Sequence, residues 1–119
     1  MKSDNAVVDK SKAFAIRIVK MYRYLREEKR EFVLSTQVLR SGTSIGANVK
    51  EAIRGQSTAD FIAKMNIALK EASEAEYWLE LLKETDYLTP EMCDSILPDC
   101  VELIKLLTAI IKTAKRGGA

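Results

Sequence analysis

The sequence predicts an all-α protein that folds as an antiparallel, up-down-up-down four-helix bundle. Apolar residues recur at alternating intervals of three and four in four separate stretches, which is the spacing of one buried helix face. Short links of two to six residues between these stretches favour antiparallel neighbours. A chain of 119 residues, 47% apolar and 30% charged, has the size and composition of one globular domain spanning residues 1–119.

The first helix is predicted over about residues 7–28. Phe14, Ile18, Met21 and Leu25 follow each other at steps of four, three and four, so they share one face and belong in the core. The segment also holds six of the chain's 19 Lys and Arg residues.

The second helix is predicted over about residues 30–54, and its middle is rich in small residues. Gly42 and Gly46 inside a helix each cost about 1 kcal/mol relative to alanine. Close approach of another helix backbone at these positions would offset that cost, because small residues let helix axes come nearer than usual. The alternative is a break in the helix at this point.

The third and fourth helices, about residues 58–86 and 90–115, are marked by their first residues. Ser57 and Thr89 are of the type that accepts hydrogen bonds from free backbone N–H groups at a helix N-terminus. Pro98 lies inside the fourth helix and predicts a kink between residues 94 and 98, because its ring opposes the carbonyl four residues back. Cys93 and Cys100 are interpreted as reduced, helix-packing residues.

The composition argues against catalysis, metal binding and membrane insertion. The chain has no histidine, which removes the usual acid–base group near neutral pH and the commonest zinc ligand. Glu71-x-x-Glu74 lacks the histidine of a bundle dimetal site, and no lysine of a phosphate loop follows Gly42-x-x-x-Gly46. We therefore expect no enzyme and no cofactor. No signal peptide or membrane span is apparent, so a cytoplasmic location is expected.

Charge is unevenly distributed along the chain. Residues 9–30 hold eight basic and three acidic residues, whereas residues 71–102 hold ten acidic and one basic. This asymmetry can reflect an electropositive surface for nucleic acid, or helices whose opposite charges complement one another across the bundle and between subunits. The candidate nucleic-acid-binding residues are Lys10, Lys12, Arg17, Lys20, Arg23, Arg26, Lys29 and Arg30.

Several apolar residues lie outside the main helix faces. They exceed what one small bundle can cover, and exposed apolar patches usually mark interfaces, so the sequence predicts a homo-oligomer. These residues are Ile16, Val19, Ile67, Leu81, Leu106 and Ile111.

A specific motif runs through the second and third helices. The block R-S-G-T-S-I-G-A-N-V-K-E-A at residues 40–52 is followed by Asp60-Phe61, by A-L-K-E-A-S-E at residues 68–74 and by Tyr77-Trp78-Leu79. This pattern resembles the bacterial four-helix-bundle family named for intervening sequences of 23S ribosomal RNA. The polar and aromatic motif residues expected to be structural are Arg40, Ser41, Thr43, Ser44, Asn48, Glu51, Asp60, Phe61, Glu71 and Glu74.

The resemblance implies a small cytoplasmic protein that often forms a ring-like homopentamer, and it transfers no catalytic residue. It also implies a fold similar to the basic, nucleic-acid-binding accessory protein of diversity-generating retroelements. This chain departs from that pattern because its net charge is only +2. Strong sequence-independent binding to nucleic acid requires many cationic contacts to phosphates.

Two functions therefore remain open. The leading hypothesis is a non-catalytic homo-oligomer that binds structured RNA or DNA through its basic first helix. The alternative is a protein–protein scaffold or accessory factor without nucleic-acid contact. Separately, we expect Arg40 to pair with a glutamate of the third helix, because buried polar groups need partners.

Overall fold

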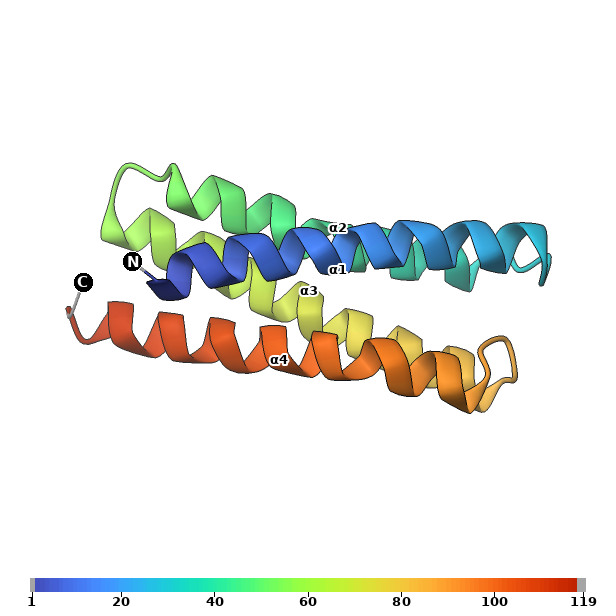
Figure 1. The fold of residues 1–119 in the computed structure, drawn as a ribbon. Coiled ribbons are helices and arrows are strands. Elements are labelled where there is room, and N and C mark those ends of the chain that lie inside the picture. The colour runs from blue at the N-terminus through green and yellow to red at the C-terminus, as the bar shows by residue number, and fades with distance from the viewer. Residues whose placement is uncertain (1, 118–119) are drawn as a thin grey trace.

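The protein is a bundle of four long helices. The structure, a computed structural model, describes the backbone of residues 2–117 and the side chains of residues 6–117. Its helices are α1 (Lys2–Glu27), α2 (Leu34–Ile53), α3 (Thr58–Glu84) and α4 (Pro90–Lys115). Consecutive helices run in opposite directions, and α1 begins at the end of the bundle where α4 finishes (Figure 1).

The helices pack in chain order around one core. Each contacts its neighbours in sequence, and α1 also contacts α4, although less extensively than it contacts α2. The molecule measures 46 × 21 × 18 Å along its principal axes. The predicted all-α, up-down-up-down fold is confirmed.

The apolar faces predicted from the sequence form the core. Phe14, Ile18 and Leu25 of α1 are buried, as are Ile45 and Val49 of α2. On the buried face of α3 three successive alanines lie between Met65 and two leucines, and α4 completes the bundle with a continuous buried face. The buried residues of these two helices are Met65, Ala68, Ala72, Ala75, Leu79, Leu82, Cys93, Ile96, Cys100, Leu103, Leu107, Ile110 and Ile111.

The glycines of α2 lie where α1 approaches most closely. A Cβ atom added at Gly42 would stand 2.8 Å from Cγ1 and 2.9 Å from Cγ2 of Ile18. At Gly46 the same atom would be 3.5 Å from the backbone oxygen of Ser11. Close approach of a neighbouring helix is therefore confirmed, through a side chain at Gly42 and through backbone at Gly46. The alternative of a break is wrong, because α2 is continuous from Leu34 to Ile53.

The second helix begins four residues later than predicted. Arg30 adopts the left-handed conformation at φ 55°, which ends α1, and the N–H of Glu31 then donates to the carbonyl of Leu25 at 2.9 Å. The carboxylate of Glu31 turns forward and accepts from the backbone N–H groups of residues 33, 34 and 35 at 3.2, 3.0 and 2.7 Å. Residues 28–33 therefore form a turn that is held by hydrogen bonds of Glu31, and the predicted start of the second helix at residue 30 is wrong.

The starts of α3 and α4 match the predicted signals, whereas the start of α1 and the end of α3 do not. The hydroxyls of Ser57 and Thr89 each accept a backbone N–H at 3.1 Å, so both predicted caps are confirmed. The first helix starts at Lys2 instead of residue 7, because no glycine or proline interrupts the turn before the buried Val7. The third ends at Glu84, two residues early, where Asp86 adopts a left-handed conformation at φ 67°.

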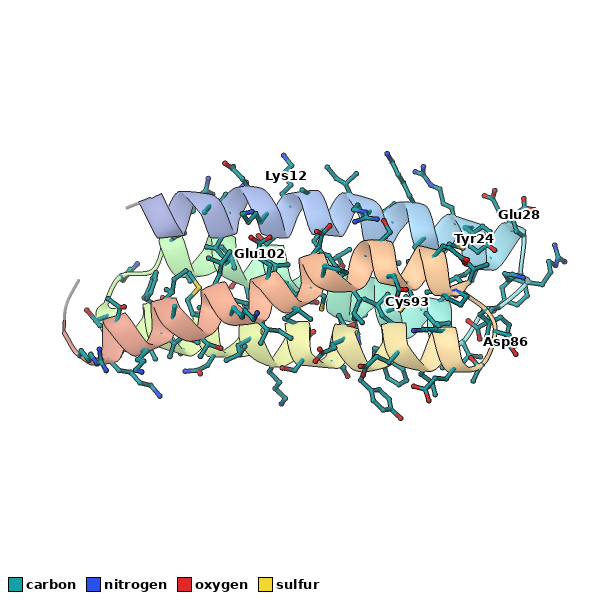
Figure 2. All side chains as sticks on the ribbon, turned by 60° about the horizontal axis from the view of Figure 1, so that its bottom comes forward. Lys12, Tyr24, Glu28, Asp86, Cys93 and Glu102 are labelled. Atoms are coloured by element: carbon teal, nitrogen blue, oxygen red, sulfur yellow. The ribbon has the colours of Figure 1, made fainter. Side chains whose placement is uncertain are left out.

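Pro98 does not break α4, which continues through it to Lys115. The kink predicted just before this residue stays a prediction. Cys93 and Cys100 are free thiols buried in the core, as expected for packing residues, and Figure 2 shows Cys93 between the helices. Burial raises the pKa of both thiols, for Cys100 to about 12.

Candidate functional site

The basic side chains of α1 divide into two groups. Lys10 and Arg17 face α4, where they pair with Glu102 at 3.0 Å and Asp99 at 2.6 Å. The guanidinium of Arg17 also donates to the hydroxyl and the carbonyl of Ser95. These two cations help to join α1 to α4, which supports the interpretation of complementary helices for this part of the charge asymmetry.

The other six candidate cations form no ion pair among the described side chains. Lys12, Lys20 and Arg23 are exposed on α1, and Lys20 also borders the cleft to α4. Figure 2 shows Lys12 directed away from the bundle. Three further cations, Arg26, Lys29 and Arg30, lie at the end of α1 and in the turn that follows.

Aromatic rings lie among the cations of that turn. The guanidinium carbon of Arg26 is 5.3 Å from the centroid of the Tyr22 ring and 4.9 Å from that of Phe32. The guanidinium carbon of Arg30 lies 5.7 Å from the Phe32 centroid. These contacts are cation–π interactions, and Phe32 as a residue nevertheless remains 47% exposed.

Phe32 was not among the candidate residues drawn from the sequence. Starting the second helix at residue 30 placed Phe32 in a regular helical turn, where one exposed apolar residue carries no signal. The available clue was an aromatic residue two positions after Arg30 and next to Val33. Only the turn conformation shows that the arginines meet the ring.

The polar residues of the sequence motif form a second cluster on α2 and α3. Arg40 donates to Glu71 at 3.0 Å and to Glu74 at 2.5 Å, which confirms the predicted contact with the third helix. The hydrogen bond that Arg40 donates to Glu74 and the charges of both glutamates raise the pKa of Arg40. Glu71 is the most buried of the three, with a side chain only 14% exposed. The cluster is an internal tie between α2 and α3.

The remaining motif residues serve local structure. Each of four side chains on α2 donates to the backbone carbonyl four residues earlier, which occupies polar groups on a closely packed helix. These four are Ser41, Thr43, Ser44 and Asn48.

The three other motif residues lie near the link between α2 and α3. Glu51 pairs with Lys64 of α3 at 3.1 Å. Asp60 donates its backbone N–H to the Ser57 cap, and half-buried Phe61 packs against the core. None of the motif residues is brought together with the basic residues of α1.

The apolar residues that were predicted to lie outside the main helix faces differ in their exposure. Ile16 and Ile67 are 49% and 44% exposed, as expected for residues without a partner in one bundle. The expectation for Ile111 is wrong, because α4 turns it into the core, where it is 6% exposed. Val19, Leu81 and Leu106 are half-buried.

Two open clefts border α4. One lies between α1 and α4 and is lined by Arg17, Lys20, Met21, Glu91, Met92, Ser95 and Ile96. The other follows α4 past Pro98. No three cysteine or acidic side chains within the described part of the chain gather into a possible metal site. Over residues 2–117, no helix is both long and apolar enough to span a membrane.

Comparison with known proteins identifies the relatives of this chain. A family model described as "23S rRNA-intervening sequence protein" matches residues 3–109. The chain belongs to this family. The resemblance inferred from residues 40–52 and the third helix is therefore confirmed, and the matched region reaches into all four helices.

A solved structure is similar to this member of the 23S rRNA-intervening sequence family. It is a protein of unknown function from the S23 ribosomal protein family of Bacteroides thetaiotaomicron, 61% identical in sequence with a TM-score of 0.92. The similarity covers 93% of this chain and 99% of that chain. Comparison with curated proteins gives no significant match.

Proposed function

We propose that this protein is a non-catalytic, cytoplasmic homo-oligomer that binds structured RNA or DNA through the basic side of α1. The observation that carries the proposal is the row of exposed cations Lys12, Lys20 and Arg23, which form no ion pair with the side chains of residues 6–117 and continue into Arg26 and the following turn. Phosphates attract such cations, and each contact releases counterions from the nucleic acid. Neither cofactor nor small-molecule substrate is part of this proposal.

The oligomer follows from apolar surface on opposite sides of the bundle. Ile16 lies on α1, whereas Ile67 and the 56% exposed Tyr77 lie on α3, whose described backbone does not come close to that of α1. Apolar surfaces on two separate helices suit a head-to-tail association, and such contacts close into a ring when the rotation between subunits allows it. A homopentamer is the ring size that the family resemblance implies.

Light scattering at micromolar concentration tests the assembly. The proposal expects a single oligomeric mass, and it expects Ile16→Lys or Ile67→Lys to lower that mass while the helical circular dichroism stays unchanged. A monodisperse monomer for the unaltered protein would end the oligomer proposal.

Salt-dependent binding of a structured RNA hairpin tests the nucleic-acid contact. Lys12→Ala and Arg23→Ala should each weaken binding and reduce the slope of log K against log salt by about 0.9 if the residue contacts one phosphate of a duplex. Lys10→Ala is the matched control, because Lys10 already pairs with Glu102. No retention at about 0.15 M salt, together with no salt slope, would contradict this half of the proposal.

A protein–protein scaffold is the second candidate. It is favoured by the pairing of Lys10 and Arg17 with carboxylates of α4, because these contacts reduce the positive charge that α1 offers to phosphates. A stable oligomer that shows no affinity for RNA or DNA would select the scaffold over the nucleic-acid-binding protein.

A further inference from the structure

The turn between α1 and α2 presents an exposed aromatic ring among arginines. Phe32 is 47% exposed and its neighbour Val33 is 69% exposed, although both follow directly on the buried Glu31. Arg26 places its guanidinium near both the Tyr22 and Phe32 rings, and Arg30 approaches Phe32 as well. The result is a compact surface, here called the arginine–aromatic turn, made of Tyr22, Arg26, Arg30, Phe32 and Val33.

The turn holds its conformation through backbone contacts that do not involve the exposed rings. The N–H of Glu31 is anchored on Leu25 of α1, and its carboxylate accepts three N–H groups at the start of α2. Glu31, the residue directly before Phe32, is thus held by both helices. Because this anchoring is independent of the ring, the exposure of Phe32 is not needed to make the turn.

The charges around the ring favour an anionic partner. Residues 23–33 carry four cations, whereas Glu27 and Glu28 are the exposed carboxylates of the same segment. The third acid, Glu31, is 8% exposed and its oxygens face backbone donors. A partner that combines negative charge with a flat apolar face would therefore match both features of the turn.

We propose that the arginine–aromatic turn binds unpaired nucleotides of single-stranded RNA or DNA. A base stacks on the accessible surface of Phe32 and the arginine planes, and Arg26 and Arg30 contact the neighbouring phosphates. Stacking on aromatic rings and arginine planes accepts any base, because every base has a π face. This inference rests on the proposed nucleic-acid function and adds a site and a ligand class to it. The turn at the end of the bundle would bind unpaired nucleotides, and α1 would bind the phosphates of an adjoining duplex.

Removing the bases from the ligand separates stacking from charge. Fluorescence anisotropy is measured with a labelled oligoadenylate of about 12 nucleotides and with an abasic strand of equal length, which keeps the phosphates. Wild-type protein should bind the oligoadenylate at least about five-fold more tightly, the lower end of the effect of stacking one base. Phe32→Leu should remove most of this preference and leave abasic binding unchanged, whereas Phe32→Trp should retain it.

Tyr77→Leu is the matched control. Tyr77 is an exposed aromatic residue on α3 whose ring contacts Trp78 and carries no guanidinium in the described structure. Its replacement should leave the preference for bases unchanged. An equal loss in Tyr77→Leu and Phe32→Leu would overturn the assignment of stacking to the turn.

Three further outcomes would also overturn the inference. Binding of oligoadenylate that Phe32→Leu does not alter, with the Lys12 effect on duplex binding intact, refutes the stacking site alone. Loss of oligomeric mass in Phe32→Leu would make the ring part of a subunit interface. Absence of binding to every nucleic acid refutes the proposed function and this inference together, so the two failures are distinguishable.

Discussion

Replacing Gly42 with alanine should test how α1 and α2 fit together, because two opposing effects can be estimated at this position. Alanine is favoured over glycine inside a helix by about 1 kcal/mol. Against this, the new Cβ would lie 2.8 and 2.9 Å from two carbons of Ile18, which is fully buried. Overpacking of this kind costs about 1–3 kcal/mol, so the net expectation ranges from no change to a loss of about 2 kcal/mol.

Gly46 supplies the matched control one helical turn away. Its added Cβ would be 3.4 Å from the hydroxyl and 3.5 Å from the carbonyl oxygen of Ser11, which is ordinary contact. Gly46→Ala should therefore gain most of the helix preference, about 1 kcal/mol. The two variants should differ in free energy of unfolding by about 1–3 kcal/mol, with Gly46→Ala the more stable.

Urea unfolding at one fixed protein concentration measures the difference, since subunit association shifts apparent stability. A second comparison uses Ile18→Ala, which removes all three side-chain carbons that crowd the site. In that background Gly42→Ala should become stabilising by about 1 kcal/mol, because the helix preference of alanine over glycine remains and the clash of the new Cβ with Ile18 is removed. Equal stability of the two single variants, or no change of sign in the Ile18→Ala background, would refute the packing argument.

Three further changes have defined outcomes. Glu31→Ala should lower the free energy of unfolding by about 1–3 kcal/mol in urea titrations, because three N–H groups lose their acceptor; an unchanged midpoint would contradict the role of Glu31. Glu71→Gln and Glu74→Gln should each cost about 0.5–1 kcal/mol less in an Arg40→Ala background, and additive losses would mean no coupling. Burial raises the pKa of Cys100 from 9.0 to about 12, so between these pH values the unfolded thiol loses its proton while the folded thiol keeps it. The free energy of unfolding should therefore fall as pH rises through this interval, and Cys100→Ala should reduce that fall. The same pH dependence in Cys100→Ala would show that Cys100 is not its cause.

The sequence by itself determined the fold class, the helix faces and the starts of α3 and α4. Periodic apolar residues specify a buried face without knowledge of the neighbours, and the caps Ser57 and Thr89 act on backbone a few residues away. The contact of Arg40 with the third helix was also predicted, although the expected burial of Arg40 was wrong, because its side chain is 49% exposed and Glu71 is the buried partner.

Only the tertiary structure decided which basic residues remain available. Charge along the chain does not reveal that Arg17 meets Asp99, whereas Lys12 points outward, since that depends on how α1 is rotated against α4. The arginine–aromatic turn depends on Glu31, whose carboxylate reaches forward to α2 while its N–H is held by α1. Local signals fix local backbone, but surface pairings between distant helices arise from their packing, and the proposed binding surface belongs to this second kind.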